Sequence, residues 1–304
     1  TISLTTHSSQ LTALPNSLKP SFMKNQQSKF TASTAYPSTG SQILARQSMA
    51  WACVSKTILP LILAFTGFLG YQHQVTAQAC NQVEDFTSAI TIGLSQAPSV
   101  WYVDRYAPNG FFSPSGDLGG ATLKHCINVA DGAVNRAPAF QGAFYNTQGR
   151  KYDLPAMTRT MQIDLYVPTA WGTSNKREAG LWGTAIDIAN AVSGYPILEF
   201  TSDGGIPRFR CYETGTGLWV DLGLPTGFVY NAWYTLEIEL LNNSEFLYTV
   251  GNLQFTTTSG SGDASVAISN VILQGYNYDP TFPLDPTNPG VTYDIYWDNY
   301  ITNL

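Results

Sequence analysis

Residues 233–250, WYTLEIELL-NNS-EFLYTV, decide the fold. From Trp233 to Leu241 polar and apolar residues alternate, so that in an extended strand every second side chain points to the same side. Three turn-forming residues, Asn-Asn-Ser, follow, and the alternation resumes from Glu245 to Val250. Two alternating runs joined by a short turn predict an antiparallel β-hairpin.

Further stretches of extended character recur along the chain, punctuated by Gly, Pro and Asn. They are Thr160–Val167, Tyr195–Phe200, Arg208–Glu213, Leu218–Leu222, Val266–Leu273 and Val291–Tyr300. Gly215 and Gly217 separate Arg208–Glu213 from Leu218–Leu222, which predicts a second hairpin. Thr184–Val192 (TAIDIANAV) is the one helical candidate, and it is short enough to be a loop turn. Many short strands predict an all-β sandwich or barrel.

The first 79 residues differ in composition from the rest. They contain five basic and no acidic residues, whereas residues 80–304 contain ten basic and 21 acidic ones, a net charge of −11. A domain with that charge repels phosphate backbones, which argues against a nucleic-acid partner. Residues 1–48, rich in Ser, Thr, Gln and Asn, are expected to be disordered or to precede the true start at Met49.

Residues 49–79 have the pattern of a secretory signal peptide. Lys56 precedes the uncharged run Ile58–Gly70, and Ala77-Gln78-Ala79 forms a small-x-small cleavage site. The apolar run is shorter than the roughly 20 residues of a membrane span. We therefore expect an extracellular protein with a single domain over residues 80–304. A short membrane anchor, an organelle transit peptide over residues 1–48 and a lipid-modified Cys80 are the alternatives.

Cleavage would leave Cys80, Cys126 and Cys211, an odd number that allows at most one intramolecular disulfide. An oxidising compartment permits a Cys126–Cys211 bond, but sequence alone does not establish the pairing. The absence of a Cys-x-x-Cys motif or Cys/His cluster excludes a structural zinc site.

The strand order resembles the concanavalin A-like (laminin-G-like) jelly-roll superfamily. The resemblance rests on WYTLEIEL, EFLYTVGNLQF and the final YDIYWDNY, and covers roughly residues 83–304. It implies an antiparallel two-sheet β-sandwich that binds or cleaves carbohydrate on its concave sheet. Three segments, WYVDRYAP (101–108), LKHCINVADG (123–132) and YNTQGRKYDL (145–154), also resemble secreted bacterial proteins of a family without an assigned reaction.

Two kinds of enzymatic site can be compared with the sequence. A retaining glycosidase needs two carboxylates about 5–5.5 Å apart, and the one Glu-x-Glu, Glu237-Ile238-Glu239, lacks a third acid and is read as a solvated strand face. A polysaccharide lyase needs groups that neutralise a sugar carboxylate and move a proton. Arg208, Arg210 and Tyr212 share one strand face and form a candidate ligand-binding surface, with cross-strand pairing as the structural alternative. We expect His125 to be a core or edge residue rather than a base.

Tryptophans add candidate sugar-binding positions, because an indole ring stacks on the apolar face of a sugar. Trp182, between Gly180 and Gly183 in a loop-like setting, is the first candidate, and Trp219, facing Arg210 across the predicted hairpin, is the second. Core packing is expected for Trp233 and Trp297.

The resemblance also implies a structural calcium ion between the first and last strands. Asp85 and Asp298 lie in the segments that such a site would use. Paired surface acids are the alternative, and no other cofactor is expected.

Together these observations favour a secreted, non-catalytic carbohydrate-binding or extracellular matrix or surface protein with a glycan partner. The alternatives are a divergent polysaccharide lyase or glycoside hydrolase acting on the concave sheet, and a structural extracellular protein that self-associates.

Overall fold

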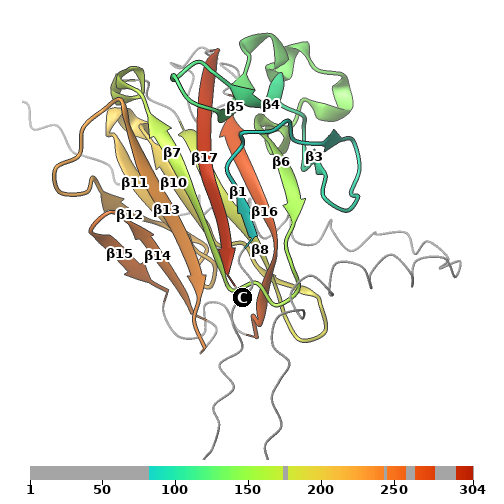
Figure 1. Ribbon diagram of the computed structural model, residues 1–304, viewed down its shortest axis with the longest axis vertical. Helices are drawn as coiled ribbons and strands as arrows, with labels where there is room; N and C mark the ends of the chain where they lie inside the picture. Colours follow the sequence, from blue (N-terminus) through green and yellow to red (C-terminus); the bar gives the residue numbers. More distant parts are fainter. Residues whose placement is uncertain (1–81, 174–176, 243–244, 258–263, 278–291, 304) are drawn as a thin grey trace, which may run out of the picture. The chain divides into compact units, whose positions relative to one another are not determined.

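The computed structural model describes residues 82–173, 177–242, 245–257, 264–277 and 292–303. Within them, two β-sheets pack face to face, which confirms the predicted all-β sandwich of the concanavalin A-like type (Figure 1). The predicted signal peptide (49–79), the segment 1–48 and Cys80 lie outside the described residues. None of the described residues belongs to a helix long and apolar enough to cross a membrane.

One sheet, here called sheet A, has eight strands. They are β1 (Gln82–Glu84), β4 (Gly110–Ser115), β5 (Thr122–Ile127), β7 (Thr160–Val167), β13 (Ala232–Leu240), β14 (Phe246–Val250), β15 (Leu253–Thr256) and β17 (Tyr293–Asn303). Their order across the sheet is β15-β14-β13-β7-β17-β5-β4, and β1 pairs with β17. Figure 1 shows β1 beside the long strand β17, drawn in red.

Sheet B has nine strands. They are β2 (Ile92–Gly93), β3 (Trp101–Val103), β6 (Thr147–Asp153), β8 (Arg177–Ile186), β9 (Val192–Gly194), β10 (Ile197–Thr201), β11 (Arg208–Glu213), β12 (Leu218–Gly223) and β16 (Ala267–Tyr276). Their order is β12-β11-β10-β8-β16-β6-β3-β2, with β9 on β8. The pair β2–β3 is parallel and the other pairs of sheet B are antiparallel.

Short 3₁₀-helices occupy the connections. They are η1 (Val129–Asp131), η2 (Ala133–Asn135), η3 (Pro138–Phe140), η4 (Ala143–Asn146), η5 (Thr169–Thr173) and η6 (Asp203–Gly205). The described residues contain no α-helix, so the helical candidate at 184–192 is wrong. Thr184 to Ile186 end strand β8, and the Asp187 carboxylate accepts hydrogen bonds from the Ala189 and Ala191 amides, which stabilises a turn into β9.

Both predicted hairpins are present. Strands β13 and β14 pair from Leu236↔Val250 to Leu240↔Phe246. Strands β11 and β12 pair with Tyr212 opposite Trp219 and Arg210 opposite Asp221. The period-2 alternation was therefore a sufficient guide to which residues of these hairpins lie on the same face.

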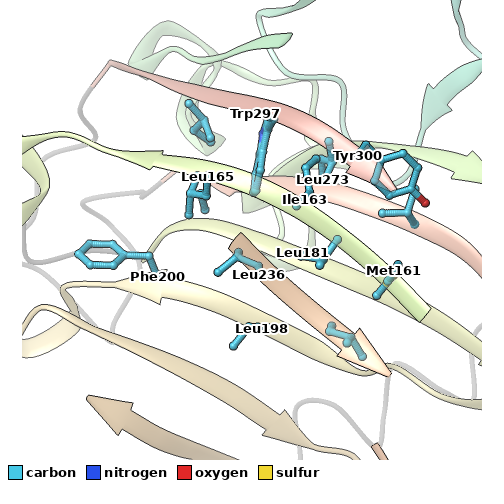
Figure 2. Packing of buried hydrophobic residues seen from close by; sticks show 14 of the residues in the cluster. Met161, Ile163, Leu165, Leu181, Leu198, Phe200, Leu236, Leu273, Trp297 and Tyr300 are labelled. Atoms are coloured by element: carbon cyan, nitrogen blue, oxygen red, sulfur yellow. The ribbon is translucent and has the colours of Figure 1, made fainter. Parts of the chain in front are cut away.

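The core lies between the sheets, where Figure 2 shows side chains of both sheets meeting. Along β7 the apolar residues Met161, Ile163, Leu165 and Val167 are all fully buried. Trp297 is also fully buried, as expected, whereas Trp233 is 37% exposed, so its assignment to the core is wrong. The sheets approach closely at Gly275, where a Cβ atom would lie 2.6 Å from Ile295 Cδ1.

Candidate functional site

The outer face of sheet B carries a cluster of polar and aromatic side chains at its centre. Alternation along β11 turns Phe209 and Cys211 into the core, so Arg210 and Tyr212 point outward. The register then places Arg210 opposite Glu199 of β10. Glu199 lies opposite Gly180 of β8, and Gly180 lies opposite Gln274 of β16. This row crosses the middle of the sheet.

Arg210 is held by two carboxylates. Its Nε and Nη2 atoms lie 2.8 Å and 2.7 Å from Glu199 Oε1, and Nη2 lies 3.1 Å from Asp203 Oδ2. The indole ring of Trp219 lies over the guanidinium at 4.2 Å, a cation–π contact. Glu199 is 1% exposed and Arg210 is 5% exposed. This geometry fixes the Arg210 side chain as a preorganised cation.

Gly180 allows two N–H groups to converge beside Glu199. A Cβ atom on Gly180 would lie 2.4 Å from Gln274 Nε2 and 2.9 Å from Trp182 Nε1. Gln274 Nε2 donates to Glu199 Oε2 at 3.3 Å. Trp182 Nε1 is buried and has no hydrogen-bond partner within the described part of the chain. A buried donor without a partner costs free energy, so this N–H is a position where a ligand acceptor would be stabilised.

Arg105 lies beside Trp182. Its guanidinium lies 4.6 Å from the Trp182 ring centroid and 4.9 Å from that of Phe144. Arg105 Nη1 is 3.6 Å from Asp104 Oδ2, an ion pair too long for a hydrogen bond. Arg105 Nε and Nη1 have no hydrogen-bond partner among the described residues. Arg105 therefore adds a cation with free N–H groups to the unpartnered indole.

Lys151 and Tyr195 also interact electrostatically with Asp104. Lys151 Nζ lies 3.7 Å from Asp104 Oδ1, so Asp104 faces both Lys151 and Arg105 at ion-pair distance. Burial raises the pKa of the Tyr195 phenol, the Arg105 cation opposes this rise, and the Asp104 charge adds to it. We call Asp104, Arg105, Lys151, Trp182 and Tyr195 the Arg105 cluster. It combines two cations, a carboxylate, a phenol and a free indole N–H.

The structure brings most of the predicted site residues together. Arg210, Tyr212, Trp182 and Trp219 share the outer face of sheet B, with the Tyr212 and Trp219 rings 5.3 Å apart. Trp182 lies within strand β8 rather than in a loop, which corrects its predicted setting. These contacts leave open whether the residues bind a ligand.

Arg208 differs from the other four predicted residues. Its Nε lies 2.6 Å from Asp221 Oδ1, and its Nη1 donates to the carbonyl oxygens of Asp203 and Ile206. Arg208 thus stabilises the turn that contains Asp203, and the Asp203 carboxylate contacts Arg210. Its contacts are those of a positioning residue.

Sequence reasoning predicted Trp182 as a site residue but missed the other four members of the Arg105 cluster. Arg105 follows strand β3 and belongs to no named strand, so alternation could not place it. Glu199 was also missed, because it looks like an ordinary strand residue until the register places it in one row with Arg210 and Gln274. The one available signal was the Asp-Arg pair within WYVDRYAP.

Glu237 and Glu239 lie on the other sheet, along β13. Burial and the charge of Glu239 raise the pKa of Glu237. Because β13 belongs to sheet A, these two acids do not join Glu199.

His125 is fully buried between the sheets, beside the Phe111 ring at 5.4 Å. Burial, with a contribution from the Arg150 charge, lowers its pKa to about 3, so it stays neutral. It is a core residue, as expected.

The two described cysteines are free thiols, with Cys126 in sheet A and Cys211 in the core face of sheet B. The Cys126–Cys211 disulfide that the sequence allowed is therefore not formed. Burial raises the pKa of each thiol to about 12.

Asp85 and Asp298, the predicted calcium ligands, both have hydrogen-bond partners close by in the sequence. Asp85 accepts hydrogen bonds from Thr87, and Asp298 Oδ1 accepts from the Asn299 amide. Across the described ranges, no group of three or more His, Cys, Asp or Glu side chains is arranged to hold a metal ion. A structural calcium ion stays a prediction.

Comparison with known proteins supports the fold. No family model matches the chain, and no curated protein matches it by sequence. A non-specific endo-β-1,3(4)-glucanase of glycoside hydrolase family 16, crystallised with a glucose oligosaccharide, is similar with a TM-score of 0.51 and 8% identity, covering 75% of this chain and 95% of that one. A Bacillus licheniformis β-glucanase matches with a TM-score of 0.42 and 11% identity, over 75% and 98% of the two chains. An alginate lyase bound to alginate tetrasaccharide matches with a TM-score of 0.47 and 12% identity, over 73% and 96%.

These comparisons correct the functional expectation. We expected a non-catalytic carbohydrate-binding or extracellular matrix or surface protein, but the solved structure that this chain matches with a TM-score of 0.51 is a glucanase, which is an enzyme. The three proteins above act on or bind polysaccharide. The identities are low, so the likeness shows the fold, and any activity of this chain must be argued from its own residues.

Proposed function

We propose that this protein is a polysaccharide-cleaving enzyme that acts on the outer face of sheet B, and specifically a lyase for chains that contain acidic sugars. One observation carries the proposal. Arg105 Nε and Nη1 and Trp182 Nε1, three buried N–H donors, lack hydrogen-bond partners within the described part of the chain, and the Arg105 guanidinium lies over the Trp182 ring.

A sugar carboxylate suits these donors. Charge-assisted hydrogen bonds from a guanidinium to a carboxylate are stronger than neutral ones, and the indole N–H can donate to the same anion. The ion pairs of Asp104 with Arg105 and Lys151 are long, at 3.6 Å and 3.7 Å. Arg105 and Lys151 can therefore exchange them for closer contacts with the carboxylate of a bound sugar. Lys151, with 18% of its side chain exposed, lies on the more accessible side of the cluster.

The reaction would be a β-elimination. Neutralising the sugar carboxylate makes the hydrogen on the adjacent carbon more acidic. Asp104 accepts that proton, a double bond forms between this carbon and its neighbour, and the glycosidic C–O bond breaks at that neighbour. The departing oxygen takes a proton from the Tyr195 phenol, which is protonated at neutral pH. No water is consumed.

Glycoside hydrolysis is the second candidate, because Glu199 and Asp203 both contact Arg210 Nη2. Two carboxylates close together are what a retaining hydrolase needs. Glu199, however, is 1% exposed and occupied by Arg210 and Gln274, which makes it a poor proton donor to substrate. The Arg105 cluster therefore supports the lyase better.

Extracellular polysaccharide is the substrate class that fits the predicted signal peptide at 49–79. We propose that the protein is secreted, because a polysaccharide-cleaving enzyme has to reach its extracellular substrate.

The test is a panel of polymers incubated with the full chain. Alginate, polygalacturonate and hyaluronan represent acidic chains, and soluble β-glucans represent neutral ones. We expect new ultraviolet absorbance from an unsaturated product with at least one acidic polymer. Trp182→Phe keeps an aromatic ring and removes the N–H, so it should lower kcat/KM about tenfold, the effect of one lost hydrogen bond of about 1.4 kcal/mol.

Arg105→Ala should lower kcat/KM further than Trp182→Phe, while the matched control Arg208→Ala should retain most activity. New reducing ends without the absorbance would indicate hydrolysis and contradict the lyase. No product from any polymer would overturn the proposal.

A further inference from the structure

A row of aromatic side chains crosses the outer face of sheet A, the face opposite the Arg105 cluster. Trp233 of β13 pairs with Tyr166 of β7 in the sheet register. Because Leu165 pairs with Trp297, the next residues, Tyr166 and Tyr296 of β17, face each other on the outer side. The ring centroids are 5.4 Å apart between Trp233 and Tyr166, and 6.4 Å apart between Tyr166 and Tyr296.

The row continues over two more strands. Tyr296 pairs with Lys124 of β5, and Lys124 pairs with Phe112 of β4. Five adjacent strands, spaced about 4.8 Å apart, give a row of about 19 Å from Trp233 to Phe112. We call these five residues the aromatic row. Its length is set by the sheet and not by a flexible loop.

The two ends of the row are exposed. Trp233 is 37% exposed and Phe112 is 47% exposed, while Tyr166 and Tyr296 are half-buried. A large exposed ring has a cost in water, so several on one face are a sign of a binding surface. Tyrosine and tryptophan combine an apolar ring face with a polar edge, which suits a sugar better than a purely apolar partner.

The charges around the row define the ligand further. Lys124 Nζ is bound to Asp117 and Asp294 at 2.7 Å and 2.9 Å, and its cation also lies 5.7 Å from the Tyr296 ring centroid. Tyr296 Oη donates to Asp117 at 2.9 Å. The Lys124 cation is thus already neutralised, and the carboxylates of Asp117 and Asp294 can accept hydrogen bonds from hydroxyl groups of a ligand.

The neighbouring register row is also acidic. Asp164 and Asp298 pair across β7 and β17. Each lies two residues along its strand from Tyr166 or Tyr296 and therefore on the same face. The carboxylates of Asp117 and Asp294 at Lys124, together with those of Asp164 and Asp298, repel an anionic polymer. They are well suited to accept hydrogen bonds from neutral sugar hydroxyls.

We propose that the aromatic row is a second glycan-binding surface, separate from the cleavage site, that takes a single chain of a neutral polysaccharide. The rings are tilted by 60° between Trp233 and Tyr166, and by 85° between Tyr166 and Tyr296. Such a row matches the turning faces of a twisted chain, whereas a flat crystalline surface needs coplanar rings. The surface would hold the enzyme on a polymer matrix. It stands on sheet A alone and does not depend on the reaction proposed for sheet B.

Affinity electrophoresis of the full chain tests this proposal. The gel contains a soluble neutral β-1,3-glucan, a soluble β-1,4-linked cellulose derivative or, as the anionic comparison, alginate. Pull-down with crystalline cellulose provides the flat surface. We expect retardation in at least one neutral gel and no binding to crystalline cellulose through this face.

Trp233→Ala should weaken the retardation about tenfold, and Trp233→Tyr should retain most of it. Phe140→Ala is the matched control, because Phe140 is 39% exposed and lies outside the row. Any activity on short soluble oligosaccharides should be the same in Trp233→Ala and wild type. Loss of binding without loss of turnover separates this surface from the cleavage site.

Two results would overturn the proposal. Equal retardation of Trp233→Ala and wild type would show that the row does not bind the glycan. A wild-type dimer that becomes a monomer in Trp233→Ala, by light scattering, would show that a second copy of the chain covers the row instead. Melting temperatures of all variants verify that each is folded.

Discussion

Replacing Arg210 by Leu would leave the carboxylate of Glu199 buried without the guanidinium that contacts it at 2.7 Å and 2.8 Å. Glu199 is 1% exposed, so water cannot take the place of the lost partner. Breaking a buried ion pair by removing one partner costs about 3–5 kcal/mol. For a domain of this size, that loss corresponds to a fall in Tm of about 6–20 °C.

The matched control is Arg208→Leu on the same strand. Its partner Asp221 has 58% of its side chain exposed, so this pair is screened by water. Its loss, including the hydrogen bonds to the turn, should cost about 1 kcal/mol. The difference between the two variants isolates burial as the cause.

Urea unfolding of the full chain, followed by tryptophan fluorescence, measures both variants. The double variant Arg210→Leu/Glu199→Leu should recover most of the lost stability, because it removes both charges. The single variant should also lose less stability at acidic pH. In it, burial raises the folded-state pKa of Glu199 above the unfolded value, so protonation below that unfolded value removes the penalty. A loss below about 1 kcal/mol for Arg210→Leu would refute this reasoning.

Three further predictions follow from packing and charge. Gly180→Ala places a methyl group against Gln274 Nε2 and should abolish most activity at a stability cost of about 1–3 kcal/mol, measured by turnover and thermal unfolding. Cys126 and Cys211, with pKa values raised to about 12, should react slowly with a thiol reagent at pH 8 in the native protein and rapidly in urea. The folded-state pKa of Asp298 is raised by burial and by the Asp164 and Asp85 charges, so the stability that it contributes is lost as pH rises through that pKa; Asp298→Asn should therefore raise Tm at neutral pH and not at acidic pH. Equal Tm changes at both pH values would contradict the last prediction.

The strand faces were predictable because they depend only on alternation. Phe209 and Cys211 lie in the core and Arg210 and Tyr212 outside it, as their spacing indicates. Trp233 was misplaced because its hydrophobicity was given more weight than its position. It shares the parity of the outward-facing Glu237, and that parity was the better guide.

The Arg105 cluster was not predictable in the same way. Trp182 and Lys151 come from two strands that the register of sheet B brings to the two sides of Ile272, and Arg105 comes from a connection that packs on Trp182. The importance of Gly180 could not be predicted either, because its lack of a side chain matters only where Gln274 and Trp182 lie against it. Non-local register is the information that a single sequence lacks.

Mass spectrometry of the products formed in oxygen-18-labelled water tests the central claim most directly. The incubation uses the full chain and the acidic polymer on which it is most active. The account predicts unsaturated oligosaccharides without the label, because β-elimination consumes no water, and predicts that Arg105→Ala abolishes them. Saturated products carrying oxygen-18 at the new reducing end would contradict it and assign the reaction to hydrolysis.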